Sequence, residues 1–136
     1  MTVLEQDWRS LDRFPFGDGP ELADELLALI LAGKKTATCW SVAEGLKGSE
    51  VGKRWVAEDG AGRPRAVLET IELTQRRFDA VDAQFAFEEG EDDRTLESWA
   101  REHERYFTRN GGYAPDMLLW CERFRLIEIL GEGADQ

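Results

Sequence analysis

Lys35 and Thr38 are the residues whose types and spacing most readily suggest chemistry. They lie in the stretch AGKKTATCW, residues 32–40. A threonine hydroxyl becomes a nucleophile when a base takes its proton and a third group stabilises the charge that develops. A lysine serves as that base only when its pKa falls from about 10.4, through burial or through a neighbouring cation such as Lys34.

The spacing restricts how these two side chains meet. In an extended strand, side chains three residues apart point to opposite faces. Lys35 and Thr38 therefore converge only if the backbone bends where a helix gives way to a strand, and Gly33 allows such a bend. Taken alone, the residues favour a simpler interpretation, in which Lys34 and Lys35 are solvated and close the helix.

A phosphate-binding loop does not fit this stretch. The P-loop pattern is G-x-x-x-x-G-K-[ST], but Gly33-Lys34 is followed by Lys35, and Ala28 stands where the first glycine is needed. The order of elements is also reversed, because a P-loop follows a strand and precedes a helix.

His103 is the only histidine of the sequence. It lies on the apolar side of a predicted helix, four residues after Trp99, which favours a boundary histidine bonded to one carbonyl. A zinc site is not expected with one histidine and two distant cysteines. A nucleophile pair formed by Cys39 and His103 stays open.

A run of acidic residues precedes that helix. Its spacing differs from the alternate acids of an EF-hand loop, so it favours a solvated loop over a cation site. Crowding can also keep one of these carboxyls protonated, or one can pair with a lysine. The run consists of Glu88, Glu89, Glu91, Asp92 and Asp93.

Tryptophans are dense, and two of them suggest a binding surface. Trp99 and Trp120 fall on predicted core-facing stripes and are assigned to packing. Trp40 and Trp55 are the candidates for stacking on a flat ring, because aromatic faces bind bases in single-strand binders.

The elements around these residues predict an α+β domain. A helix begins at Pro20 and ends at Gly33, with Asp18 as its cap and an apolar stripe that includes Leu26 and Ile30. A strand follows over TATCWSV, and two more strands flank the turn DGAGRP as a hairpin. A second helix, capped by Asp93 or Thr95, ends at Asn110-Gly111-Gly112. The last strand, MLLWCERFRLIEIL, places one set of apolar residues on one face: Trp120, Phe124, Leu126 and Leu130.

Composition limits the classes of function. The 136 residues suffice for one domain, and the formal net charge is −11. Tight binding to a long polyanion usually leaves a basic footprint, so this charge favours a small neutral substrate. The apolar runs are too short for a membrane span, and the first residues lack the apolar core of a secretory signal. With two separated cysteines, these features predict a cytoplasmic protein with no membrane partner.

Three segments together resemble the ASCH domain family. They are FPFGDGPELADELLALILAGKKTATCW, FAFEEGEDDRTLESWAREHERYF and ERFRLIEIL. The resemblance covers about residues 14–130 and implies that residues 1–136 form a single domain. It also implies a PUA-like fold, a small β-barrel with flanking helices. The family signature G-x-K-x-x-T is met by Gly33, Lys35 and Thr38.

The resemblance also implies a function. The family is proposed to bind RNA near the signature, and one type of small member removes the acetyl group from N4-acetylcytidine. The Thr, Lys and Glu used by that type correspond to Thr38, Lys35 and Glu89. We therefore expect a hydrolase without metal or cofactor, with Thr38 as nucleophile, Lys35 as base and Glu89 as the orienting or oxyanion partner. The expected substrate-binding residues are Gly33, Lys34, Trp40, Lys53, Arg54 and Trp55.

One departure and two alternatives accompany this expectation. Many members continue the signature as T-x-R, whereas Trp40 stands at the arginine position. Other members are ribonucleases on single-stranded RNA, which predicts phosphate contacts. A non-catalytic module that recognises a modified nucleoside would instead hold Lys35 and Glu89 in a stable ion pair. The phosphate contacts of the RNA alternative would be Lys34, Lys35, Lys53, Arg54, Arg63 and Arg65.

Overall fold

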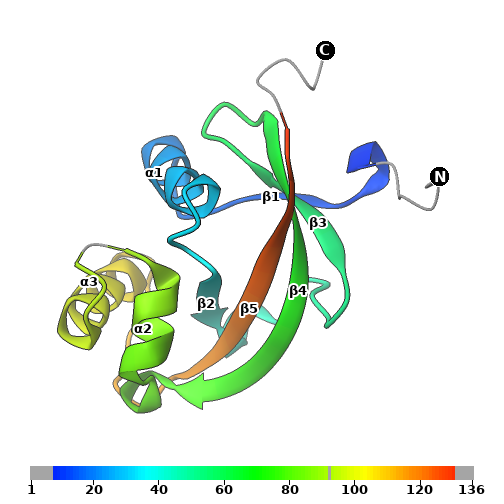
Figure 1. Cartoon of the computed structure of the whole chain (residues 1–136). Helices are drawn as coiled ribbons and strands as arrows, with labels where there is room; N and C mark the ends of the chain where they lie inside the picture. Colours follow the sequence, from blue (N-terminus) through cyan, green and yellow to red (C-terminus); the bar gives the residue numbers. More distant parts are fainter. Residues whose placement is uncertain (1–7, 92, 131–136) are drawn as a thin grey trace.

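The protein folds around one mixed sheet of five strands. The computed structural model describes residues 8–91 and 93–130. Along the sheet the strand order is β1-β3-β4-β5-β2, and all neighbours except the parallel pair β1–β3 are antiparallel (Figure 1). The bounds are β1 Arg13–Pro15, β2 Ala37–Ser41, β3 Arg54–Glu58, β4 Pro64–Arg77 and β5 Leu118–Ile129. The predicted hairpin and the long last strand are confirmed.

The predicted α+β, PUA-like fold is confirmed, but the strongly curved sheet of the described residues does not close into a full barrel. In the part of the chain that the structure describes, no ladder joins the edge strands β1 and β2. Bulges between Val67 and Leu68 and between Thr70 and Glu72 bend the two long strands β4 and β5. Closure would need an edge strand long enough to reach across, and β1 has only three residues.

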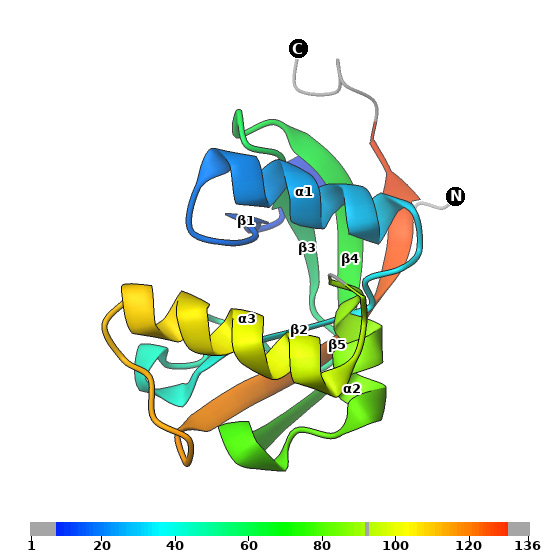
Figure 2. The same cartoon turned by 90° about the vertical axis from the view of Figure 1, so that its left-hand side faces the viewer.

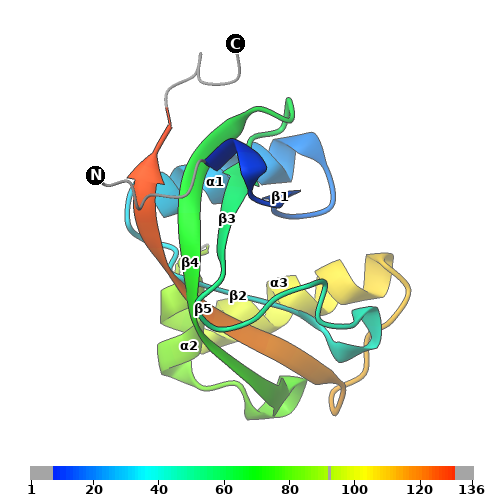
Figure 3. The same ribbon diagram turned by 90° about the vertical axis from the view of Figure 1, so that its right-hand side faces the viewer.

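The three α-helices of the described residues lie on one side of the curved sheet, as Figures 1 and 3 show in two perpendicular views. They are α1 Pro20–Leu31, α2 Ala83–Glu89 and α3 Leu96–Arg109. Figure 2 shows α1 above α3, with β2 passing behind α3. None of the helices among the described residues is long and apolar enough to cross a bilayer.

The helix ends confirm one predicted cap and correct another. Thr95 caps α3 by accepting a hydrogen bond from the Ser98 amide. Asp18 does not cap α1, whose N-cap is Gly19 without a side-chain bond. Instead the Asp18 carboxylate bonds Arg109, at 2.7 Å to Nε, and Asn110, so it ties the start of α1 to the end of α3.

Two core clusters divide the helical side of the sheet. Under α1, Leu26 and Ile30 pack with Trp55, Leu68 and Phe124. Under α2 and α3 a second cluster contains Phe78, Phe85, Trp99, Phe107, Leu119 and Cys121. The α1 stripe is thus confirmed at its centre.

The predicted single apolar face of the last strand is confirmed only at Phe124. Trp120 is half-buried and joins no core cluster among the described residues, whereas Leu119 on the other face is buried in the second cluster. Leu126 is 38% exposed, and Leu130 joins a separate cluster with Val56 and Val67. The bulge next to Val67 adds a residue to β5 after Leu126, and this extra residue breaks the two-residue alternation between Leu126 and Leu130.

Candidate active site

The chain bends sharply between α1 and β2, as the convergence of Lys35 and Thr38 requires. Gly33 has φ +77°, and the amides of Lys34 and Lys35 both bond the Leu29 carbonyl. Gly90, with φ +76°, lies so close to this bend that a Cβ there would stand 2.4 Å from the Lys34 carbonyl oxygen. This close approach, which only glycine permits, brings the end of α2 against Lys35.

Lys35 is buried and fully bonded. Its side chain is 1% exposed, and Nζ donates to Glu89 Oε1 at 3.0 Å, Glu91 Oε2 at 3.0 Å and the Ala37 carbonyl at 2.9 Å. Lys34 is exposed, so the interpretation of two solvated lysines is wrong for Lys35. Burial by itself lowers the pKa of Lys35, but the charges of Glu91 and Glu89 outweigh it and raise the pKa above its usual value. Lys35 is therefore an ammonium ion.

Glu89 is the centre of this cluster. It is 1% exposed, and its Oε2 accepts a hydrogen bond of 2.8 Å from the Trp99 indole. Burial opposes its charge, but Lys35 and His103 lower its pKa well below the usual range. Trp99 thus bonds the acid as well as packing in the core.

His103 completes the cluster from α3. Its Nδ1 donates to the Trp99 carbonyl at 2.9 Å, which confirms the predicted bond to one carbonyl, and Nε2 lies 3.4 Å from Glu89 Oε2. Burial lowers the pKa of His103, but the charge and hydrogen bond of Glu89 raise it above the ordinary value.

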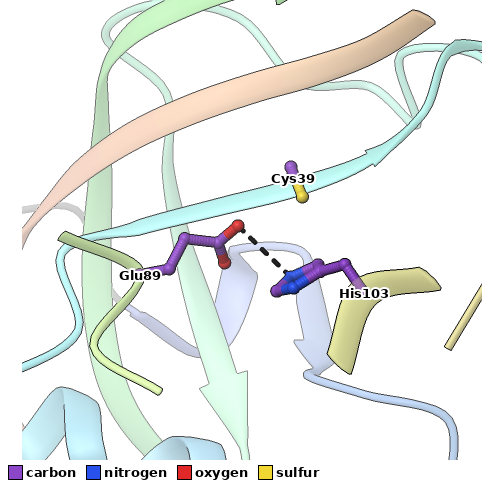
Figure 4. A group of neighbouring side chains, drawn as sticks. All are labelled: Cys39, Glu89 and His103. Atoms are coloured by element: carbon purple, nitrogen blue, oxygen red, sulfur yellow. Dashed lines mark ion pairs between the residues drawn. The ribbon is translucent and has the colours of Figure 1, made fainter. Parts of the chain in front are cut away.

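Cys39 reaches the same carboxylate from β2 (Figure 4). Its Sγ and the facing atoms of Glu89 and His103 all lie within 4.8 Å of one another, a spacing that could hold a cation. However, Glu89 already accepts bonds from Lys35 and Trp99, and the Lys35 ammonium would repel a metal ion. Burial and the Glu89 charge raise the pKa of the Cys39 thiol well above its ordinary value. Hydrogen bonds and ion pairs, and not a metal ion, therefore hold this cluster together. Because the Cys39 thiol stays protonated, a Cys39–His103 nucleophile pair is disfavoured.

Two adjoining cavities open beside this cluster. The smaller, about 130 Å³, lies between α1 and α3 and is lined by Lys35, Thr38 and Glu89, so the three predicted catalytic residues meet there. The larger, about 300 Å³, shares Thr38 and Cys39 with it. Its aromatic walls come from four separate parts of the chain: Phe14, Phe16, Trp40, Trp55 and Tyr106.

The predicted substrate-binding residues divide into two groups. Trp40, Trp55 and Lys53 line the larger cavity. Gly33, Lys34 and Arg54 line neither of the two cavities.

The cations near the larger cavity are paired with acids. Lys53 Nζ bonds Asp12 at 2.6 Å, and Lys47 Nζ lies 2.7 Å from Glu44. Arg63 and Arg65, which line neither of the two cavities, both bond Asp59. The cavity mouth therefore offers little uncompensated positive charge to a phosphate.

Sequence reasoning missed Glu122 on β5. This acid is 3% exposed, lines the larger cavity and is the register partner of Thr38. Its Oε2 accepts a hydrogen bond from the Thr70 hydroxyl. Burial raises the pKa of Glu122, although the bonds from Thr70 and Trp55 and the charge of Lys35 partly offset this. The signal was present in the sequence, since period two places Glu122 on one face with Trp120 and Phe124.

Comparison with known families and structures gives a consistent result. The ASCH domain family model matches residues 12–128. A crystal structure of protein EF3133 from Enterococcus faecalis V583, assigned to the family model DUF984, is 31% identical. It has a TM-score of 0.76, and the match covers 87% of this chain and 77% of that one. The comparison with curated proteins found no match.

Two further structures share the fold. An ASCH domain from Lactobacillus crispatus JV V101 is 28% identical with a TM-score of 0.78, over 88% of this chain and 80% of that one. A point mutant of ZmASCH from Zymomonas mobilis is 12% identical with a TM-score of 0.56, over 81% and 71% of the two chains. At that identity the second likeness concerns the fold alone.

Proposed function

The chain belongs to the ASCH domain family, and from this premise we propose that it hydrolyses the amide of an N4-acylated cytidine. Membership implies an RNA-related function. The observation that carries the finer proposal is the position of Thr38. Its side chain lines both the larger, aromatic cavity and the smaller cavity, which Lys35 and Glu89 also line. A hydroxyl placed between a ring-sized space and a fixed charge cluster suits attack on a carbonyl bound in that space.

The size and charge of the larger cavity favour a nucleoside. About 300 Å³ is the lower end of the range for small-molecule sites, and such sites are mostly apolar with a few polar groups. The aromatic walls would stack on a pyrimidine ring. The neighbouring lysines are paired with acids and the formal net charge is −11, so a neutral nucleoside fits better than a polyribonucleotide.

We assign the reacting groups in the following way. The Thr38 hydroxyl attacks the acyl carbon, as the sequence predicted. The base role predicted for Lys35 would require a free amine, which Glu89 and Glu91 oppose by raising its pKa. We therefore propose that Lys35 positions Thr38 through its bond to the neighbouring Ala37 carbonyl, and that its ammonium stabilises negative charge that develops nearby. Glu89 holds Lys35 in place.

Turnover of N4-acetylcytidine tests the proposal. Cytidine and acetate are expected from the native protein and from Thr38→Ser, which keeps a hydroxyl. Thr38→Val keeps the shape without the hydroxyl and is expected to lose about 10⁴-fold in kcat. Thr36→Val, two residues earlier at an exposed position, is the matched control and should retain activity. Absence of acetate release by the native protein, or full activity of Thr38→Val, contradicts the proposal.

The second candidate is a non-catalytic module for a modified nucleoside. The complete pairing of Lys35 with Glu89 and Glu91 favours it, because the module requires a stable ion pair there. The exposure of Thr38 to both cavities favours the hydrolase. Binding of N4-acetylcytidine without any release of acetate would identify the module.

A further inference from the structure

A threonine that attacks a carbonyl must give up its proton, and Lys35 is not available to receive it. The Lys35 ammonium already donates three short hydrogen bonds, of 2.9 or 3.0 Å, to oxygens of the protein, and these bonds hold it in its protonated form. A residue that takes the Thr38 proton must therefore lie elsewhere on the wall of the larger cavity and must be free of a cation that holds it ionised.

Glu122 meets this requirement by its place in the sheet. Thr38 on β2 and Glu122 on β5 are register partners in an antiparallel pair. Such partners project to the same face with Cβ atoms about 4.5–5.5 Å apart, a separation that a glutamate side chain is long enough to span. Both side chains line the larger cavity, where a substrate would also touch them.

The carboxyl of Glu122 is held by neutral donors. The Thr70 hydroxyl bonds Oε2, and the Trp55 indole in turn bonds Thr70 Oγ1 at 3.2 Å. No ion pair to Glu122 is found among the described residues, in contrast to Glu89. A buried acid that faces a cavity and has no ion-pair partner among the described residues is suited to proton transfer.

We propose that Glu122 is the general base of the reaction, a catalytic residue that accepts the Thr38 proton and returns it to the leaving amine. This inference rests on the proposed function, since it assigns a role within that reaction.

Glu122 carries the proton in both halves of the reaction. The Glu122 carboxylate takes the proton as Thr38 Oγ1 bonds to the acyl carbon, and the proton then passes to N4 as the carbon–nitrogen bond breaks. Cytidine leaves and Thr38 carries an acyl ester. A water molecule attacks this ester while Glu122 takes one of its protons. The carbon–oxygen bond to Thr38 breaks, Thr38 recovers its proton from Glu122, and the carboxylic acid departs.

The charge environment of Glu122 is shared among several elements. The titratable groups on the same cavity are Cys39 from β2, Lys47 and Lys53 from the segment before β3, and Tyr106 from α3. Lys35 also favours the ionised form of Glu122. An ionisation seen in the pH profile is therefore assigned to Glu122 only if the Glu122 variants remove it.

The test compares kcat and KM for N4-acetylcytidine as a function of pH. Glu122→Gln keeps an oxygen that can accept the Thr70 bond, so it should fold and bind cytidine within about threefold of the native protein, while kcat falls about 10²–10⁴-fold. The acidic limb of the kcat/KM profile should disappear in its residual activity. Glu122→Asp keeps a shorter carboxyl and should recover part of the loss. Glu128→Gln, an exposed acid on the same strand, is the matched control and should change nothing.

Three results would overturn the inference while the proposed function stands. Native-like kcat in Glu122→Gln shows that another group is the base. A rise in KM and in the dissociation constant of cytidine, with kcat unchanged, shows that Glu122 only binds the ring. An acidic limb that persists in Glu122→Gln assigns the ionisation to a different group. The proposed function fails separately, when the native protein itself releases no acetate.

Discussion

Two buried glutamates lie on either side of Thr38, and their surroundings differ sharply. Glu89 is 1% exposed and bonds Lys35, Trp99 and, more distantly, His103. Glu122 is 3% exposed and accepts its bond from the neutral Thr70 hydroxyl. The pKa of Glu89 is lowered by these cations, whereas burial raises the pKa of Glu122.

This difference in surroundings distinguishes an acid that stabilises the fold from an acid that can transfer a proton. An acid paired with the Lys35 ammonium stays ionised and holds segments together, because loss of that cation leaves an uncompensated charge. An acid buried without a cation destabilises the folded chain, and such a residue is expected where proton transfer is needed. At similar burial, Glu89 is therefore suited to a structural role and Glu122 to the proton transfer that we propose.

Among these substitutions, loss of the Lys35 ammonium should destabilise the protein most. Lys35→Met leaves Glu89 and Glu91 without their shared cation and is expected to cost about 3–5 kcal/mol of unfolding free energy. Urea unfolding at neutral pH measures the change. Lys34→Met, at the exposed neighbouring position, should stay within about 0.5 kcal/mol of the native protein. Equal unfolding free energies of the two variants would show that the ion pairs of Lys35 make no net contribution to stability.

Removal of the indole donor should have the next largest effect. Trp99→Phe leaves Glu89 Oε2 without its 2.8 Å bond and should cost about 1–3 kcal/mol. Trp40→Phe loses an exposed bond to the Gly45 carbonyl and serves as the comparison in the same unfolding experiment. If Trp40→Phe cost as much as Trp99→Phe, the buried acceptor would have no special importance.

Glu122→Gln should raise the free energy of unfolding, whereas the two substitutions at the Glu89 cluster lower it. A folded-state pKa above the unfolded value means that ionisation of Glu122 costs stability as pH rises through this interval. The neutral glutamine avoids this cost, so a gain of about 0.5–2 kcal/mol is expected near pH 7. The gain should vanish below the unfolded pKa of about 4.3. Thermal unfolding from pH 4 to pH 8 follows it, and a loss of stability near pH 7 would contradict the contrast with Glu89.

The Asp18–Arg109 pair is a solvent-exposed ion pair, in contrast to the buried Lys35–Glu89 pair. Its removal should give the smallest change in unfolding free energy. The hydrogen bonds of Arg109 and Asn110 lower the pKa of Asp18 to about 2. Its stabilisation is present above the unfolded value of 3.8 and is lost as pH falls toward 2. Solvent screening limits Asp18→Asn to a loss of about 0.2–1 kcal/mol at pH 7. Glu25→Gln, exposed on α1, is the control. A difference from the native protein that survives well below pH 2 would not come from the carboxylate.

The sequence was sufficient for the elements that follow local rules. The Pro20 start of α1, the Thr95 cap, the hairpin and the long β5 each follow from capping, turn or period-two patterns, and the structure has them all. The parallel strand β1 was not predicted, because three residues give no periodicity and the strand exists only through its pairing with β3. The bulges that bend β4 and β5 likewise depend on contacts between distant strands.

The candidate site shows the same limit. Spacing could place a bend at Gly33, but the burial of Lys35 depends on Gly90, more than fifty residues later, which lets α2 approach. The charge state of Lys35 follows from Glu89 and Glu91 together, so residues 32–40 alone suggested solvated lysines. Glu122 could have been found as the one acid between Trp120 and Phe124 on a predicted core face. Its partnership with Thr38 required the register of β2 against β5.

The central claim is that Thr38 faces a bound acyl nucleoside in the larger cavity. A crystal structure of Thr38→Val with N4-acetylcytidine tests it most directly, because this variant keeps the cavity but stops turnover. We predict the pyrimidine between the aromatic walls, with the acyl carbon about 3–3.5 Å from the position of the Thr38 hydroxyl. A nucleoside bound on another surface, or an empty cavity at millimolar nucleoside, would contradict the account.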